Sequence, residues 1–347
     1  MKRFFRSKRN RIIVICIVLL VGIGVGAAFY FLRPEEKEPV KKKKAKKKIV
    51  EKLKIVDEDS NKRPIAIMID NNVGSTSHKG LQDAYITYEI IVEGGLSRIM
   101  AIYKDRETAE IGPVRSSRHY FLDYALESDC IYTHFGWSPF AEKDIKALGV
   151  NNLNGLYDNA PFWRVSDYRA PHNVFTSIEK IYSAAKEKGY ALETSDWKLL
   201  NYSVKKINLN ELYPEDTNIK QANSVSFSFS PTQVRGFTYN SEGEYYLRSM
   251  NNVPHTDATT KEQYHYKNVI LIKVANSTLD SYGRQDLNTT GTGDGFYLTN
   301  GYAIPIKWTK SSRNSKTSFT YNDEEIKIND GNTMVEIVPI NNNIVIA

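Results

Sequence analysis

Residues 111–129 read IGPVRSSRHYFLDYALESD, and this segment decides the class of the fold. It opens with a glycine-proline turn and continues as a helix, because apolar residues recur at helical spacing from Phe121 to Leu126. Ser116 or Ser117 is a candidate cap for the first turn, since a hydroxyl oxygen can accept a hydrogen bond from a free backbone N–H there. The segment therefore predicts a turn and a helix placed between strands.

Short apolar segments flank this helix on both sides. We predict strands at 63–72, 84–95, 97–105 and 130–135, and helices at 136–149 and 177–189. Alternating strands and helices are typical of an α/β domain, and the tight EGGLS connection at 93–97 favours an antiparallel pair. We expect residues 64–220 to form an α/β domain with a mixed sheet.

The chain after residue 220 has a different pattern. SVSFSFS at 224–230 alternates strictly, and further short strand-like segments follow, separated by turns rich in asparagine and glycine. We expect residues 221–347 to form a predominantly β domain. The predicted fold is therefore α+β overall, with two folded domains.

The N-terminus predicts a membrane anchor and a spacer. Residues 12–32 contain no charge for 21 positions, long enough to cross a bilayer as a helix. The basic segment 1–11 precedes them and predicts a cytoplasmic start, with the rest of the chain outside the cytoplasm. Residues 33–63 include seven lysines at 41–48 and lack a hydrophobic period, so we expect a disordered stalk. The segment 12–32 is interpreted as an uncleaved, single-pass signal anchor in the cell membrane.

The net charge of +7 belongs to this N-terminal part. Residues 1–63 carry a net charge of +12, and residues 64–347 carry −5. A nucleic-acid-binding domain concentrates positive charge on its fold, so this class of partner is excluded. The two cysteines, Cys16 and Cys130, have no metal-type spacing.

Arg115 and Arg118 lie at the predicted helix start, where the helix dipole favours anions and disfavours cations. Ligands of α/β sheets bind where strands end and loops lead into helices, and several ionisable residues fall at such junctions. The candidate ligand-binding residues are Arg115, Arg118, Arg98, Arg169 and Asn173. The candidate catalytic residues are His134, His172, Asp70 and Glu89.

Three hypotheses account for these residues. In the first, the arginines pair with Glu89, Glu93 and Asp70 in a buried network that fixes loops. In the second, they bind an external phosphate or carboxylate at the helix start. In the third, the histidines act with a carboxylate as metal ligands or as a general base, although their spacing carries no metal signature.

A second group of candidates lies in the β domain. Arg248, His255 and Asp257 are close together in YYLRSMNNVPHTDA at 245–258. They are placed either to cap a hairpin or to complete a site shared with the first domain. No hydrolase, zinc, Walker or kinase signature occurs, so neither a cofactor nor a metal is predicted and the question of catalysis stays open.

Several longer motifs resemble those of the YerB-like family of bacterial membrane-anchored lipoproteins. They include RPIAIMIDNN at 63–72, IGPVRSSRHYFLDYA at 111–125, RAPHNVF at 169–175 and GTGDGFYLTNG at 291–301. The resemblance covers nearly all of residues 63–339 and implies a two-domain extracytoplasmic protein tethered to the membrane of Gram-positive-type bacteria. It carries no catalytic roles. This chain lacks the processed cysteine of a lipoprotein, so the transmembrane helix is expected to replace the lipid anchor.

The predicted function is binding of an anionic cell-envelope component at the arginine-rich site. Alternatives are a non-catalytic scaffold that binds another envelope protein, and an envelope phosphoryl- or glycosyl-transfer enzyme.

Overall fold

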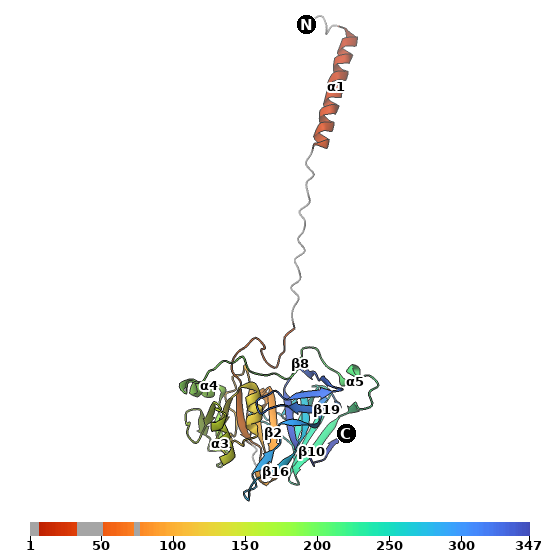
Figure 1. The fold of residues 1–347 in the computed structure, drawn as a ribbon. Helices are drawn as coiled ribbons and strands as arrows, with labels where there is room; N and C mark the ends of the chain where they lie inside the picture. Colours follow the sequence, from red (N-terminus) through yellow and green to blue (C-terminus); the bar gives the residue numbers. More distant parts are fainter. Residues whose placement is uncertain (1–6, 33–50, 73–76) are drawn as a thin grey trace. The chain divides into compact units, whose positions relative to one another are not determined.

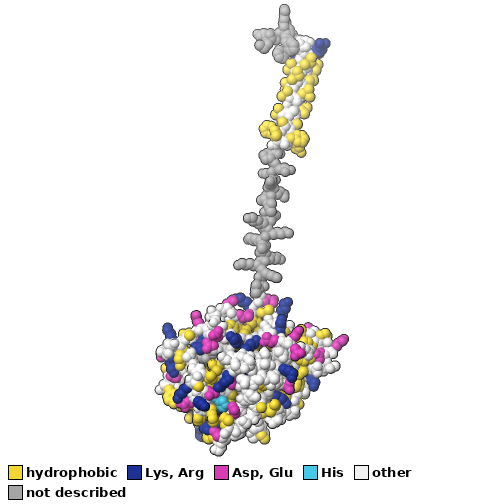
Figure 2. Space-filling view, in the orientation of Figure 1, with side chains coloured by type: hydrophobic (Ala, Val, Ile, Leu, Met, Phe, Trp, Pro, Cys, Tyr) yellow, Lys and Arg dark blue, Asp and Glu magenta, His cyan; other side chains and the backbone are white. Residues whose placement is uncertain are grey.

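The computed structural model describes residues 7–32, 51–72 and 77–347 (Figure 1). Residues Met1–Val50 and Glu51–Ala347 form separate units. The first unit contains helix α1, Lys8–Phe31, which has a mean hydropathy of 3.0 and is long and apolar enough to cross a membrane. Hydrophobic side chains cover most of this helix, and Lys and Arg side chains lie at its upper end (Figure 2). The predicted stalk residues 33–50 lie outside the described residues.

A twelve-stranded mixed sheet forms the centre of the unit Glu51–Ala347. Its main path runs β21-β20-β19-β18-β15-β23-β2-β3-β1-β4-β5, with β9 paired to β19. The strands are β1 Ile65–Asp70, β2 Ile86–Ile91, β3 Ser97–Tyr103, β4 Ile131–His134, β5 Asn152–Asn154, β9 Lys220–Gln221, β15 Asn268–Val274, β18 Gly291–Thr299, β19 Tyr302–Lys310, β20 Ser318–Tyr321, β21 Glu324–Glu325 and β23 Thr333–Pro339.

A second sheet of six strands is antiparallel throughout. Its strands are β10 Ser224–Ser230, β11 Gln233–Asn240, β12 Tyr245–Met250, β13 Val253–Pro254, β14 His265–Tyr266 and β24 Ile344–Ile346. Three two-stranded pairs complete the β structure: β6 Phe162–Arg164 with β7 Val174–Thr176, β16 Asn276–Thr278 with β17 Gln285–Leu287, and β8 Tyr202–Ser203 with β22 Ile328–Asn329. The mixed sheet and the mainly antiparallel C-terminal region confirm the predicted fold class.

The helices of this unit are short. They are α2 Phe121–Ala125, α3 Pro139–Ala147, α4 Ile178–Glu187 and α5 Leu209–Leu212, with 3-10 turns η2 Leu81–Asp83, η3 Glu93–Gly95 and η4 Leu126–Ser128. Ser138 and Ser177 cap α3 and α4 through hydrogen bonds from backbone N–H groups. Helix α2 has no side-chain cap: the hydroxyl oxygen of Ser117, one of the two predicted caps, accepts a hydrogen bond from Tyr132 instead. Helices α3 and α4 lie together at one side of the unit (Figure 1).

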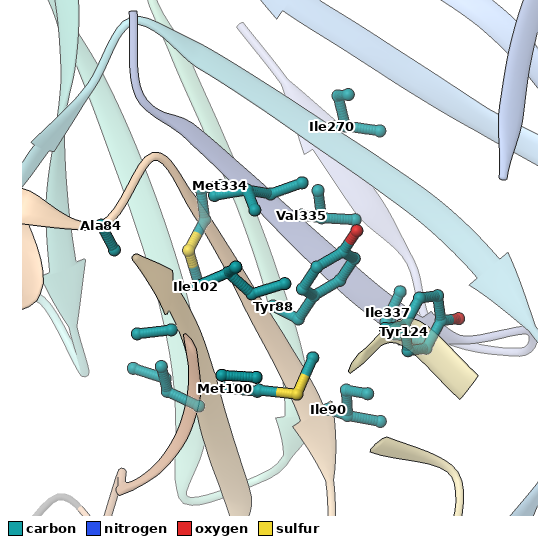
Figure 3. Packing of buried hydrophobic residues seen from close by; sticks show 14 of the residues in the cluster. Ala84, Tyr88, Ile90, Met100, Ile102, Tyr124, Ile270, Met334, Val335 and Ile337 are labelled. Carbon is teal, nitrogen blue, oxygen red and sulfur yellow. The ribbon is translucent and has the colours of Figure 1, made fainter. Parts of the chain in front are cut away.

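The large sheet crosses the boundary that the sequence suggested at residue 220. Strand β23 pairs in parallel with β2 on one side, where Ile86 faces Thr333, and with β15 on the other. Strands β2 and β23 are buried at every position, as expected for strands covered on both faces. Figure 3 shows Tyr88, Met334 and Ile337 packed in the shared core.

Residues 51–63, predicted as the end of the stalk, pack against the folded unit instead. Leu53 and Val56 are buried, and the carboxylate of Asp330 accepts hydrogen bonds from the backbone N–H groups of Lys54 and Ile55 at 2.7 and 3.0 Å. Arg63 is also buried and pairs with Asp129 at 2.6 Å. Burial of two apolar side chains and these charge-assisted contacts offset the loss of conformational entropy when this segment, which has no hydrophobic period, becomes ordered.

Candidate functional site

The segment 111–118 lies beside the end of β1 and places its arginines there. The N–H of Asp70 donates to the Pro113 carbonyl at 2.8 Å, and the N–H of Arg115 donates to the Met68 carbonyl at 2.9 Å. These bonds hold the Arg115 guanidinium near the Asp70 carboxylate, with 3.7 Å between Nε and Oδ2. A guanidinium Nη1 of Arg115 also donates to the Pro171 carbonyl at 3.2 Å.

Arg118 makes a two-point ion pair. Its Nε and Nη2 donate to the two carboxylate oxygens of Glu93 in η3, at 2.5 and 2.7 Å. Burial raises the pKa of Glu93, but the hydrogen bond and charge of Arg118 outweigh that effect and leave the pKa below its ordinary value. Arg118 and Glu93 therefore compensate each other within the protein.

Arg98 is the buried member of the cluster. It lies on β3 opposite Asp70 and donates from Nη1 to the Ser116 carbonyl at 2.8 Å. Within residues 51–72 and 77–347, no carboxylate lies within 4.0 Å of it. Burial, together with the charges of Arg118 and Arg115, lowers the pKa of Arg98 to about 10. Repulsion from its two neighbours makes this a place where an additional anion is favourable.

The cluster has an excess of one positive charge. Among the described residues, the carboxylates that face Arg98, Arg115 and Arg118 are those of Asp70 and Glu93. The buried Nε of Arg115 has no hydrogen-bond acceptor among the described residues, although a buried donor normally has one. We call these five residues the arginine cluster.

His172 contacts the arginine cluster through Asp70. Its Nδ1 is hydrogen-bonded to the Asp70 carboxylate, and its side chain is 31% exposed. Burial raises the pKa of Asp70, but Arg115 and His172 outweigh it and hold the pKa below its ordinary value. An ionised carboxylate on Nδ1 keeps the proton on that nitrogen, which leaves Nε2 as the basic nitrogen of the neutral ring.

The structure does not bring the other first-domain candidates to the cluster. His134 is completely buried, with Nδ1 bonded to the Gly136 carbonyl at 2.8 Å and Nε2 to Asn152 at 3.2 Å. Burial lowers its pKa to about 4. Asn173 holds its own loop through Arg164 at 2.7 Å, and Arg169 is exposed.

Glu89 belongs to a second cluster on the opposite face of the large sheet. Arg98 lies opposite Ile90 in the pairing of β2 and β3, whereas Glu89 lies opposite Ile99, so Glu89 and Arg98 point to different faces. The hypothesis that Glu89 pairs with the cluster arginines is therefore wrong. Strand register decides this, and the sequence alone did not specify the register.

The second sheet covers Glu89. Arg235 of β11 and Arg248 of β12 donate to its two carboxylate oxygens at 2.6 and 2.5 Å, and all three side chains are fully buried. Asn71 and Ser97 donate to Oε1 as well, at 2.6 and 2.5 Å. Burial raises the pKa of Glu89, but the two arginines outweigh it and lower the pKa to about 2. We call Glu89, Arg235, Arg248 and Glu336 the buried cluster.

Glu336 completes this cluster and behaves differently. It lies beside Glu89 on β23, is fully buried, and neither carboxyl oxygen has a hydrogen-bond partner among the described residues. Burial and the charge of Glu89 raise its pKa well above the ordinary value. Neither Arg235 nor Glu336 was among the candidates drawn from the sequence. The available signal was a charged residue at a position that the strand pattern predicts to be buried: Arg235 in QVRGFTYN at 233–240 and Glu336 in TMVEIVP at 333–339.

Two of the C-terminal candidates, Arg248 and His255, are connected by hydrogen bonds to His78 and Asp70. Arg248 is hydrogen-bonded to His255 Nδ1, and His255 Nε2 lies 3.0 Å from Nδ1 of His78, whose Nε2 is bonded to the Asp70 carbonyl. A carbonyl only accepts, so His78 carries its proton on Nε2, and His255 then does so too. Burial lowers the pKa of both histidines, which agrees with two neutral rings.

Asp257 accepts hydrogen bonds from its own turn and from a residue far away along the chain. Its carboxylate accepts hydrogen bonds from the N–H groups of Thr259 and Thr260, which closes a turn. The other oxygen accepts from the Gly80 N–H at 2.9 Å. Within the described ranges, no three His, Cys, Asp or Glu side chains are grouped to hold a metal ion.

Comparison with known proteins now identifies the family. The model of the N-terminal domain described as a protein of unknown function, DUF3048, matches residues 52–191, and that of its C-terminal domain matches residues 225–335. The chain belongs to the DUF3048 family. It is 29% identical to YerB, a candidate lipoprotein of Bacillus subtilis (strain 168), over 288 residues, which are 83% of this chain and 84% of YerB.

The fold is shared with a solved member. The crystal structure of YerB from Bacillus subtilis superposes with a TM-score of 0.72 at 27% identity, covering 82% of this chain and 94% of that one. The resemblance to YerB-like proteins is thus confirmed. An N-terminal apolar helix in a relative of a candidate lipoprotein indicates membrane association.

Proposed function

We propose that this DUF3048 protein is a membrane-anchored extracytoplasmic protein whose arginine cluster binds a phosphate or carboxylate group of a cell-envelope component. The observation that carries the proposal is the uncompensated charge, because three arginines face two carboxylates in the described chain. The buried Arg98 is the arginine that has no carboxylate partner there. An anion that accepts from the buried Nε of Arg115 would satisfy the unused donor as well as the charge.

The topology is part of this proposal. Helix α1 remains uncleaved and spans the membrane once, with residues 1–11 in the cytoplasm and the folded unit outside. The six basic residues before the apolar stretch support that orientation, and a long folded domain is translocated regardless of the seven lysines at 41–48. Proteinase added to intact spheroplasts is expected to digest the folded unit, and protection until lysis would contradict the orientation.

Thermal unfolding of the full chain in detergent, with and without inorganic phosphate or pyrophosphate, tests the ligand. At 100 times its dissociation constant an anion adds about 2.7 kcal/mol, or roughly 5 °C for a unit of this size. Arg115→Ala is expected to abolish the shift. Arg106→Ala is a matched control, because Arg106 is also half-buried, donates to one backbone carbonyl at 3.0 Å and has an unpartnered Nε among the described residues.

Two results would contradict the proposal. If neither anion shifts the wild-type protein, or if Arg115→Ala keeps the full shift, the cluster does not bind these groups. The protein would then be better described as a non-catalytic scaffold whose arginines are structural, since Arg118 and Glu93 already form an ion pair within the protein.

The Asp70–His172 contact favours a second function, transfer of a phosphoryl or glycosyl group. An imidazole held by a carboxylate on Nδ1 is the usual arrangement of a general base. With Nε2 as the base, His172 would take a proton from a water whose oxygen bonds to phosphorus while the P–O bond to the leaving phosphate breaks. His172→Gln is therefore expected to leave anion binding in place while it abolishes release of phosphate from pyrophosphate. Equal release by both proteins would exclude this role.

A further inference from the structure

A groove of about 680 Å³ lies beside the first turn of α4, and it shares no residue with the arginine cluster. Trp163 of β6 and Tyr182 of α4 contribute aromatic rings, and Lys62, Glu107, Glu179 and Lys180 contribute charged groups. Binding sites for small molecules have volumes of about 300–1,000 Å³ and combine apolar walls with a few polar groups. The groove has both properties.

The two rings are half-buried and held in place. The Tyr182 hydroxyl donates to the Arg63 carbonyl at 2.6 Å, and Trp163 lies on a strand paired with β7 opposite Phe175. An ammonium group accompanies each ring: Lys62 Nζ is 4.6 Å from the Tyr182 centroid, and Lys180 Nζ is 6.0 Å from that of Trp163. The Tyr182 ring is therefore oriented before any ligand binds, and the backbone that carries Trp163 is fixed by strand pairing.

The groove contains equal numbers of positively and negatively charged side chains, and these side chains form no ion pairs with one another. Lys62 and Lys180 carry two positive charges, and Glu107 and Glu179 carry two negative ones. In the described parts of the chain, none of these four side chains makes an ion pair. The two carboxylates are thus able to accept hydrogen bonds from a ligand, the two ammonium groups lie over the aromatic rings, and the groove has no net charge to attract an ion.

We propose that this groove binds a neutral oligosaccharide. Sugar rings present C–H faces that pack on aromatic rings, and their edges carry hydroxyls that both donate and accept hydrogen bonds. Aromatic platforms with separate donors and acceptors match both properties. The lack of net charge distinguishes this site from the arginine cluster, which has an excess of positive charge.

Titration of the full chain with chitotetraose, in a detergent without a sugar head group, tests the proposal. Isothermal calorimetry is expected to detect binding that changes less than about twofold between 0.05 and 0.5 M NaCl, since screening has little effect on a neutral ligand. Trp163→Ala is expected to weaken binding at least tenfold. Lys180→Ala, at an exposed position that cannot threaten the fold, is expected to weaken it several-fold.

Two control variants distinguish binding in the groove from binding elsewhere on the protein. Tyr282→Ala removes an aromatic ring that is 71% exposed and outside the groove, and it is expected to leave the affinity unchanged. Arg115→Ala is also expected to leave it unchanged, so failure here and failure of the anion site are distinguishable. The proposal is overturned if the wild-type protein does not bind millimolar chitotetraose, or if the groove binds a peptide and not the oligosaccharide. It is also overturned if Trp163→Ala and Lys180→Ala both retain full affinity for chitotetraose.

Discussion

The two faces of the large sheet carry two arginine clusters with different surroundings. On one face, Glu89 receives hydrogen bonds from Arg235 and Arg248, and the second sheet seals all three from solvent. On the other face, Arg115 is partly exposed and lies 3.7 Å from Asp70, with an unused donor. Arg235 and Arg248 lie on strands that the second sheet contributes and are sealed from solvent, whereas Arg115 lies in the segment 111–118, outside the strands, and keeps partial exposure.

The largest expected effect breaks the buried cluster. Glu89→Ala removes the carboxylate that pairs with two buried guanidinium groups, and Glu336 beside them has no hydrogen bond to either among the described residues. Removal of one partner of such a pair costs about 3–5 kcal/mol. Urea unfolding at pH 7 measures this loss. Lys307→Ala, at a site whose side chain is 69% exposed, is the control and should change stability by less than about 0.5 kcal/mol. A loss below about 1 kcal/mol for Glu89→Ala would show that this cluster contributes little.

Acid should weaken the same cluster. The folded-state pKa of Glu89 is about 2, below the unfolded value of about 4.3, so its stabilisation is fully present above about pH 4.3 and is lost as pH falls toward 2. The shift corresponds to about 3 kcal/mol. The stability difference between wild type and Glu89→Gln, measured in urea from pH 7 to 3, is expected to shrink with falling pH. A constant difference would contradict this assignment.

Glu336 is expected to respond with the opposite sign. Its folded-state pKa is raised, so the folded protein keeps a proton that the unfolded chain loses above about pH 4.3. Glu336→Gln removes this cost and is expected to stabilise the protein by about 1–2 kcal/mol at pH 7. The gain should disappear at pH 4. A loss of stability at pH 7 would show that Glu336 is ionised beside the arginines.

The smallest stability effect is expected on the open face. Arg115→Ala breaks a long, partly exposed ion pair and one hydrogen bond, so the free energy of unfolding should fall by less than about 1 kcal/mol. Urea unfolding without added anion measures it. A loss as large as that of Glu89→Ala would make the two clusters alike and would remove the basis for a ligand site.

Much of the fold could be predicted from local patterns. The helices predicted at 136–149 and 177–189 contain α3 and α4, and the apolar stretch 12–32 predicted most of the N-terminal helix, because helix caps and runs of apolar residues act over a few positions. The stalk prediction was too long at its C-terminal end, since burial of Leu53 and Val56 depends on a surface built by distant residues.

The candidate site was predictable only in part. Arg115, Arg118, Arg98, Asp70 and His172 were all candidates from the sequence, and the structure brings these five side chains together. The sequence did not reveal that His134 is sealed. It also did not reveal that Glu89 pairs with Arg235, 146 residues away along the chain.

The sequence by itself determined the apolar N-terminal helix, the class of the fold and the residues able to carry charge near the end of β1, because hydrophobic period and residue type are local properties. Only the tertiary structure decided which arginine meets which carboxylate. A shift of one residue in strand register moves a side chain to the other face of the sheet. The β2–β3 register places Glu89 and Arg98 on different faces, and Arg235 and Arg248 reach Glu89 from strands 146 and 159 residues further along the chain, a contact that no local pattern specifies.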